Sequence, residues 1–546
     1  MDLINVKSRA FGTTTGIAVT DLDGDGHFDV IIAVYDGPNK ILMYDHQMED
    51  YIDVTETNTA FTALMDSAGH AVAVCACDID GDGWEEIYIH NENPMYPVTT
   101  GSSSAPDRLF KNVNGEYIDL FSIPVNAGIT SWYGGTSVAC IDRLGLGIYD
   151  IIVNTYTPDG IGTYSLVSVD REKSSSNYTV VKDKSHSLGP IHDKAGQGIL
   201  VGPILVNASQ SHIFVTNDNR YHKGSSFYRH DPSNVLLKNN KDGTFTDIAL
   251  EIGLTDHIEN GRGAITADLN EDGILDIVFV NWQGPTRIFL QNNEGHFKSF
   301  VDQTFCFPSA TDYLLASDLN NDGYIDIMKA AADDSDANQS NNRIHAVIYN
   351  SAVNNIEFVQ NQLINASSYK HLKIRGIAAA DIDNDGTIEL FVSHEPFYQK
   401  TVSIFAVNKS ANNWIRVVPL TKHGAPARGC LVALTVGDYV KRAVIGGDCS
   451  YVCQSEPVAH FGLGEKFARE LSITWPNGHQ IRRFLKERDH RQTLVIKYSG
   501  IVTFKKPETA EQFLISASEV AQTIPVTLFA FQMLHLYMLN NIFYSD

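Results

Sequence analysis

The chain has 546 residues, of which 43% are hydrophobic, so it can bury a sizeable core. Acidic residues outnumber basic residues by 65 to 41, and the formal net charge is −24. This charge argues against a nucleic-acid partner, because phosphates require a basic face, and it suits metal-binding loops or a solvated surface instead. Seven cysteines are too few for a small disulfide-dense scaffold.

The N-terminal sequence, MDLINVKSRAFG, has no apolar run of the length of a signal peptide. It leads almost at once into the first of several repeats. Two interpretations remain open. Either the protein is cytosolic, or its biological start lies upstream, together with a signal peptide and a strand that pairs with the first repeat.

A nine-residue acidic pattern occurs five times along the chain. Each copy has an acid at position one, Asp or Asn at three, Asp at five, Gly at six and an acid at nine. Repetition of so constrained a pattern excludes a chance acidic turn. The residues at positions one, three, five and nine are Asp21, Asp23, Asp25 and Asp29; Asp78, Asp80, Asp82 and Glu86; Asp268, Asn270, Asp272 and Asp276; Asp318, Asn320, Asp322 and Asp326; and Asp381, Asp383, Asp385 and Glu389.

The spacing within the pattern is that of a calcium loop. Ca²⁺ takes roughly six to eight oxygen ligands, and alternate residues of a tight loop can converge on one point. Glycine at position six permits the sharp turn, and position seven can offer its backbone carbonyl. We therefore predict a calcium site in each copy, up to five ions in all.

An EF-hand does not fit these loops, because it needs a bidentate Glu at position twelve and flanking helices. Position twelve here is Ile32, Ile89, Phe279, Lys329 and Val392. The flanks are short β-branched and apolar runs, such as GIAVT before the first copy and FDVIIAV at its end. Such runs predict buried strands, so each loop links two strands of a sheet.

Neighbouring copies are spaced by roughly 50 to 65 residues, which is the length of a four-stranded propeller blade. The long gap between the second and third copies has room for two degenerate units. One retains Asp142 and Asp150 but no middle ligands, and the other, near 196–217, retains only its strands. We predict an all-β protein with a seven-bladed β-propeller over residues 1–405; a β-helix or several β-sandwiches are the alternatives.

The loops and their flanking strands resemble the VCBS/FG-GAP repeats of integrin α-subunit heads and many extracellular proteins. That resemblance implies Ca²⁺ binding on one rim of a seven-bladed propeller. The Phe-Gly element survives at Phe11-Gly12, and the Gly-Ala-Pro element is reduced to DGPNK at 36–40 and QGPTR at 283–287. These departures argue against integrin-like ligand binding.

Residues 406–498 have the pattern of a separate small β-domain, with Gly-rich turns between alternating strands. This module resembles the ASPIC/UnbV domain in Asn413-Trp414-Ile415-Arg416, Gly446-Gly447, SEPVAHFGLG at 455–464 and Trp475-Pro476-Asn477-Gly478. FG-GAP repeats followed by this domain resemble the cartilage acidic protein family of secreted matrix proteins. The resemblance implies an extracellular location.

Cysteines and glycosylation sequons give weaker signals. Cys75 and Cys77 are too close for an easy bridge on one strand, whereas one bridge could form among Cys430, Cys449 and Cys453. Acceptor sequons for N-glycosylation occur at Asn177, Asn207, Asn338, Asn365 and Asn408.

The C-terminal tail, 499–546, contains an apolar segment at 523–544 that is long enough to span a bilayer. Pro525, Gln532 and His535 dilute it. It could be a membrane or lipid anchor, a docked helix, or an artefactual end of the sequence.

No HExxH, Walker, CxxC or GxSxG motif is present, so we predict no enzyme. His460, Arg416, Arg442 and Trp475 are expected to have packing and hydrogen-bonding roles. The sequence thus predicts a calcium-binding, non-catalytic extracellular module that binds a protein or glycan, and no nucleic acid. The alternatives are a membrane-tethered adhesion receptor and a carbohydrate-active propeller enzyme.

Overall fold

The computed structural model describes residues 3–505, except for 46, 49, 93–104, 130–134, 156–162, 175–177, 192–193, 219–232, 303–304, 307–308, 332–343, 350–357, 362–372, 398–399, 408 and 450. The apolar segment 523–544 and the sequons at Asn177, Asn338, Asn365 and Asn408 therefore lie outside the described residues. Within the described part, no helix has the length and apolar character needed to cross a membrane.

Seven four-stranded antiparallel units make up the N-terminal part of the described chain. The first three are β2 (Thr14–Thr20), β3 (Asp29–Val34), β4 (Lys40–Asp45) and β5 (Asp50–Asp53); β6 (Ala71–Cys77), β7 (Glu86–Asn91), β8 (Arg108–Val113) and β9 (Glu116–Asp119); and β10 (Gly135–Ile141), β11 (Asp150–Thr155), β12 (Thr163–Val169) and β13 (Val181–Asp183).

The fourth to sixth units are β14 (Gly196–Gly202), β15 (His212–Asn217), β16 (Val235–Asn239) and β17 (Phe245–Asp247); β18 (Gly261–Ala267), β19 (Asp276–Gly284), β20 (Arg287–Gln291) and β21 (Phe297–Phe300); and β22 (Ser309–Ser317), β23 (Asp326–Ala331), β24 (Ile344–Tyr349) and β25 (Phe358–Asn361). The seventh has β26 (Ile374–Ala380), β27 (Glu389–Phe397), β28 (Lys400–Val407) and β1 (Leu3–Arg9). Among the described residues, helix is limited to 3-10 turns such as η1 (Thr59–Met65) and to the short α1 (Ala249–Ile252).

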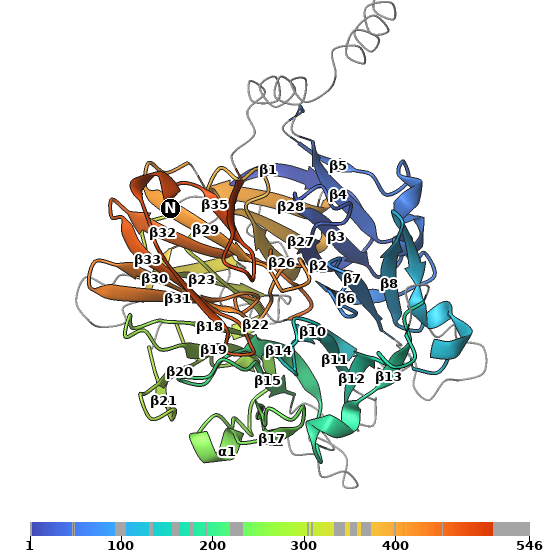
Figure 1. The fold of residues 1–546 in the computed structure, drawn as a ribbon, viewed down its shortest axis with the longest axis horizontal. Helices are drawn as coiled ribbons and strands as arrows, with labels where there is room; N and C mark the ends of the chain where they lie inside the picture. The colour runs from blue at the N-terminus through green and yellow to red at the C-terminus, as the bar shows by residue number, and fades with distance from the viewer. Residues whose placement is uncertain are drawn as a thin grey trace, which may run out of the picture.

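The first strands of the units form a closed ring. Each contacts the next in the order β2, β6, β10, β14, β18, β22 and β26, and β26 contacts β2 again. Their labels surround the centre of the view in Figure 1. This arrangement is a β-propeller, as the sequence predicts.

The ring closes by pairing the two ends of the propeller sequence. β1 is antiparallel to β28, with Leu3 opposite Val407 and Arg9 opposite Val402. The expectation that a strand of the first unit lies upstream is therefore wrong, because β2 to β5 complete that unit. The N-terminal strand belongs to the seventh unit instead.

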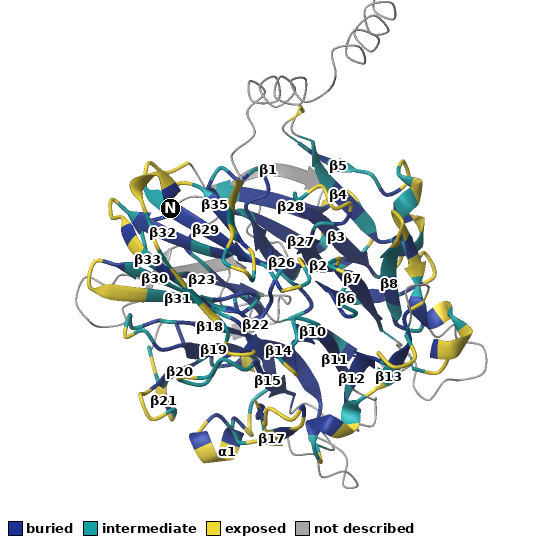
Figure 2. Cartoon of the chain, viewed as in Figure 1, coloured by how far each residue is buried: buried dark blue, intermediate teal, exposed yellow. Residues whose placement is uncertain are grey.

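The core of the propeller lies between the units. The inner strands are buried on both faces, since each sheet packs between two others, and all six residues of β3 are buried. Phe391 of the seventh unit is fully buried and meets Tyr51 of the first unit edge to face at 5.2 Å. Figure 2 shows this pattern, with buried strands near the centre and exposed residues at the outer turns.

The C-terminal module, residues 413–505, is built from two further four-stranded sheets. One orders its strands as β32 (Ala459–Gly464), β29 (Asn413–Pro419), β35 (Thr493–Ile496) and β36 (Val502–Lys505). The other orders them as β31 (Tyr439–Val444), β30 (Leu431–Val436), β33 (Ala468–Thr474) and β34 (Gln480–Phe484). A core of its own, with Trp475 at 3% exposure, joins these strands.

One segment of the module fills the centre of the propeller ring. This central segment, 447–456, hydrogen-bonds to the first strand of every unit. The bonds are Val19 N to Gln454 O, 3.0 Å; Val74 N to Val452 O, 3.4 Å; Val452 N to Ser137 Oγ, 3.4 Å; Tyr451 Oη to Gln197 Oε1, 3.4 Å; Thr266 N to Gly447 O, 2.9 Å; Ala316 N to Asp448 O, 3.1 Å; and Glu456 N to Ala379 O, 3.1 Å.

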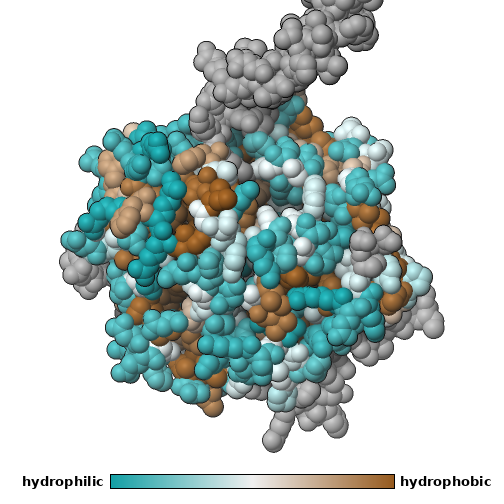
Figure 3. Space-filling view, viewed as in Figure 1, coloured by the Kyte–Doolittle hydropathy of each residue, from teal (hydrophilic) through white to brown (hydrophobic). Residues whose placement is uncertain are grey.

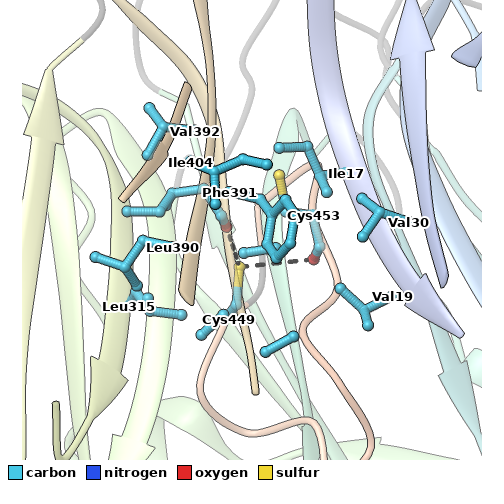
Figure 4. Close-up of a cluster of buried hydrophobic side chains, with 14 of the residues drawn as sticks. Ile17, Val19, Val30, Leu315, Leu390, Phe391, Val392, Ile404, Cys449 and Cys453 are labelled. Carbon is cyan, nitrogen blue, oxygen red and sulfur yellow. Dashed lines mark hydrogen bonds between the residues drawn. The ribbon is translucent and has the colours of Figure 1, made fainter. Parts of the chain in front are cut away.

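The cysteines pair differently from the expectation. Cys77 is bonded to Cys140 of the neighbouring unit, whereas Cys430, Cys449 and Cys453 are buried and are not disulfide-bonded. A bridge from Cys430 does not form because that residue lies in the core of the module, while the other two pack in the central channel. Figure 4 shows Cys449 and Cys453 among apolar side chains of the propeller, with the Cys449 thiol directed at the backbone oxygens of Ile377 and Cys453.

We predict that Phe391→Ala lowers the free energy of unfolding by about 3–5 kcal/mol, because it leaves a cavity between the first and seventh units. Denaturant titration measures the loss. The control is Phe484→Ala in the module, since the Phe484 side chain is 81% exposed and its removal opens no cavity. Equal effects of the two substitutions would contradict this account of the core.

Candidate metal centres

The five acidic loops share one location and one hydrogen-bond pattern. Each joins the first and second strands of a unit, and its position-nine acid is the first residue of the second strand. The position-one carboxylate accepts a hydrogen bond from the glycine N–H at position six. The five distances are 2.9 Å for Gly26 to Asp21, 3.0 Å for Gly83 to Asp78, 2.9 Å for Gly273 to Asp268, 2.8 Å for Gly323 to Asp318 and 2.8 Å for Gly386 to Asp381.

The position-nine carboxylate closes each loop from the other side. It accepts from the backbone N–H at position two, at 2.8 Å for Leu22 to Asp29, 2.9 Å for Ile79 to Glu86, 3.0 Å for Leu269 to Asp276, 3.1 Å for Leu319 to Asp326 and 3.3 Å for Ile382 to Glu389. These bonds direct the acids of one loop toward one another. Hydrogen bonds from the backbone therefore hold the acids at both ends of each loop.

Two positions of each loop adopt a left-handed backbone. The glycine at position six has φ of 80° to 98° in all five loops. Position four is left-handed too, at Gly24, Gly81, Glu271, Asn321 and Asn384. The sequence analysis missed this second position, although Gly and Asn recur there and are the residues that tolerate this conformation best.

The predicted ligands come together closely enough to hold a cation. Ligand oxygens of three acids lie within 4.8 Å of one another in the first loop (Asp21, Asp23, Asp25), the second (Asp78, Asp80, Glu86) and the last (Asp381, Asp383, Asp385). In the other two loops, Asn270 and Asn320 supply amide oxygens at position three. Carboxylate and amide oxygens are the ligands that Ca²⁺ prefers.

Buried carboxylate oxygens without a hydrogen-bond partner support this fit. Asp268 Oδ1 and Asp326 Oδ1 are buried, and neither has a partner atom within the described structure. An acceptor left unpaired in the interior costs free energy, which a cation at the centre of the loop would recover. The residues present therefore suit a hard divalent cation.

Burial also raises the pKa of these acids. It raises the pKa of Asp78 and Asp268 to about 7 and that of Asp276 and Asp318 to about 8, and the neighbouring carboxylates of the same loop raise it further. A cation would reverse this effect by stabilising the ionised forms. Loop charge and metal affinity are thus linked to pH.

The described residues of the degenerate third and fourth units form no such centre. In the third, Asp142 still accepts from Gly147 N at 2.7 Å, but the guanidinium of Arg143 forms a 2.5 Å ion pair with Asp150, the position-nine acid. In the fourth, the buried His212 begins the second strand where an acid stands in the other units. These units keep the turn and have lost the ligand set.

The C-terminal module covers much of the rim that carries the loops. His423 packs against Gly81 and Gly83 of the second loop, and Trp414 packs against Gly386 of the last. Lys441 pairs with Glu271 of the third acidic loop at 3.3 Å and donates to the carbonyl of Gly323 in the fourth. The loops therefore have a second role as the docking surface of this module.

Two loop asparagines at position four make direct bonds to the module. Asn384 accepts from Arg416 Nη1 at 2.6 Å, and Asn321 Oδ1 lies 2.7 Å from His460 Nε2. Arg416 also pairs with Asp381 at 3.2 Å and with Glu456 of the central segment. Sequence reasoning could not foresee these contacts, because position four of the loop offers no ligand.

Three of the four residues expected to have packing and hydrogen-bonding roles, Arg416, His460 and Trp475, are held in such contacts. His460 is half-buried, and loss of solvation together with the charge of Arg416 lowers its pKa to about 3, so it is neutral. Trp475 donates from Nε1 to the carbonyl of Leu420 at 3.0 Å. Arg428, which the sequence analysis did not single out, pairs with the buried Glu85 at 2.9 Å and fixes the module to the second unit.

The first loop is the most accessible of the three acidic clusters. Asp23 and Asp25 are exposed and Asp21 is half-buried, whereas Asp78 and Asp381 are buried. Trp84 of the second loop packs against Gly24 and remains partly exposed beside the first loop. An ion in this loop would face solvent.

Comparison with known proteins accounts for both parts of the chain. Residues 11–89, 213–279 and 268–328 match the FG-GAP-like repeat, and residues 420–502 match the ASPIC and UnbV domain. Cartilage acidic protein 1 of Xenopus tropicalis is 37% identical over 503 residues, which cover 88% of this chain and 73% of that protein. The chain belongs to the cartilage acidic protein family.

The human member of this family, also named cartilage acidic protein 1, is 36% identical over 502 residues, 88% of this chain and 72% of that protein. Among solved structures, BBS1N in complex with ARL6DN aligns over 75% of this chain and 98% of the matched chain, with a TM-score of 0.42 and 11% identity. That structural likeness is too distant to bear on function.

We predict that the metal-free protein loses stability as pH rises from about 5 to about 8. The raised pKa values mean that the folded state holds more protons than the unfolded state over this range, so deprotonation on raising the pH weakens the fold. Saturating Ca²⁺ should reduce this loss, because it binds the ionised carboxylates. Thermal midpoints in chelator and in Ca²⁺ at several pH values measure both effects, and a midpoint in chelator that rises with pH would contradict the prediction.

Proposed function

We propose that this chain is a calcium-binding extracellular protein that acts as a non-catalytic interaction module in the matrix or at the cell surface. The observation that carries the proposal is the repeated convergence of oxygen ligands in loops of identical backbone geometry. A role as metal ligands explains the acids of the loops, so no catalytic role is needed to account for them.

Calcium would act here as a structural ion. The acids at positions one, three, five and nine would hold it, and each ion would offset two of the negative charges that make the chain strongly acidic. Affinities near ~10⁻⁴–10⁻³ M are expected, as for other extracellular calcium modules. Such sites are filled outside the cell and largely empty in the cytosol.

Three observations support an extracellular location. The relatives are named cartilage acidic protein 1. The Cys77–Cys140 disulfide suits an oxidising compartment. Asn207, the sequon residue that the structure describes, is exposed on the loop between β14 and β15, where a glycan could be attached.

The partner would be an extracellular protein or glycan. The face in Figure 3 is mostly hydrophilic, and its apolar residues lie in several separate patches. Because the central segment fills the ring, a partner would bind on the outer surface, where the first loop is open to solvent.

We predict that Asp25→Asn removes one bound Ca²⁺ per chain and leaves the fold intact, since Asp25 is an exposed ligand of the first loop. Isothermal titration calorimetry with Ca²⁺ on the full chain measures the stoichiometry. The matched control is Glu251→Gln on α1, an exposed acid outside the loops, which should change nothing.

Absence of calcium uptake by the unmodified protein, together with a melting temperature that chelator does not change, would refute the calcium proposal. Equal stoichiometry in Asp25→Asn and in the control would refute the assignment of the first loop.

A further inference from the structure

The second acidic loop differs from the others because a single cationic side chain contacts three of its four predicted ligands. The ammonium group of Lys111 lies 2.7 Å from Asp80 Oδ2 and 3.1 Å from Glu86 Oε1, and it also donates to Asp82. These are the acids at positions three, nine and five. One side chain of the protein thus contacts three of the four predicted ligands.

Lys111 is well placed to remain there. Its side chain is only 14% exposed, and it comes from β8, the strand that pairs with β7, where Glu86 begins. Thr179 of the third unit adds a 2.6 Å hydrogen bond to Asp80 Oδ2. Charge-assisted hydrogen bonds of this kind are stronger than neutral ones, and partial burial weakens their competition with water.

The strand register shows that this cation is specific to the second unit. Phe110 of β8 pairs with Ile87, the residue after Glu86 at position nine, and Lys111 follows Phe110 in the chain. The residues at the same register in the other four units with acidic loops are Met43, Leu290, Ile348 and Ala406. None of these can carry a charge, so the second is the one acidic loop with a basic residue at this register. In the last loop Arg416 and Lys409 each pair with a single predicted ligand, Asp381 and Asp385 respectively.

The third unit gives a precedent within the same chain. There the middle ligands are lost, and Arg143 neutralises the remaining position-nine acid. The second loop combines a complete ligand set with such an internal cation. A Ca²⁺ ion in this loop would have to displace the ammonium group from three carboxylates, because two cations in one small cluster repel each other.

We propose that Lys111 is the resident cation of the second loop and excludes Ca²⁺ from it, so that the chain binds at most four ions rather than five. This inference rests on the proposed calcium binding of the other loops. The second loop then stays closed at any calcium concentration, and it holds the contacts with His423 and Thr179 in place when the other loops are empty.

The test is the number of Ca²⁺ ions bound by the full chain in equilibrium dialysis. Lys111→Met, which introduces the side chain of the first unit at this register, should bind one ion more than the unmodified protein. Asp80 Oδ1, which is buried without a hydrogen-bond partner, is one of the atoms that the new ion would use. Lys238→Met is the matched control, since Lys238 has the same register in the fourth unit, is exposed and has no acidic loop beside it.

The substitution Asp82→Asn distinguishes exclusion of Ca²⁺ by Lys111 from a folding defect caused by Lys111→Met. In the unmodified background it should leave the number of bound ions unchanged, and in the Lys111→Met background it should remove the additional ion. An unchanged number in Lys111→Met, or loss of an ion in Asp82→Asn alone, would overturn the inference while the calcium proposal stands. If the unmodified protein binds no Ca²⁺, the calcium proposal fails, and this inference fails with it.

Discussion

The central segment of the C-terminal module is the contact on which the rest of the structure depends. It hydrogen-bonds to the first strand of all seven units, through its backbone in six of them and through the Tyr451 side chain in the fourth, so one short segment satisfies polar groups that line the centre of the ring. It also places Cys449 and Cys453 in the largest apolar cluster. The propeller and the module therefore form one packed body, and the module is not a freely moving appendage.

The second constraint is charge. Five loops place carboxylates close together on one rim, and burial by the docked module makes their repulsion stronger. More than one kind of cation compensates the repulsion between these carboxylates. Arg143, Lys111 and Arg416 each pair with loop acids, and the proposed calcium ions would neutralise the remainder. Charge, metal binding and docking are consequently coupled at this rim.

Local patterns made the repeats predictable, because loop and strand lie within about twenty residues of each other and follow the period of a strand. The acidic loops, the strands and the β-propeller all follow from such patterns. Ring closure by β1, the Cys77–Cys140 bridge and the contacts of Asn321 and Asn384 join residues far apart in the chain. No local signal encodes those pairings. Lys111 could have been found from the sequence by aligning the third strands of the units, which needs the strand register.

Closure of the ring by β1 and β28 has a consequence for folding. β1 pairs with a strand made roughly 400 residues later, so the seventh unit cannot form until the whole propeller sequence has been synthesised. Pairings of such large sequence separation carry a high entropic cost of loop closure and form slowly. Until then, β1 has no partner strand and presents unpaired backbone groups to other chains, which makes this stage of synthesis exposed to aggregation.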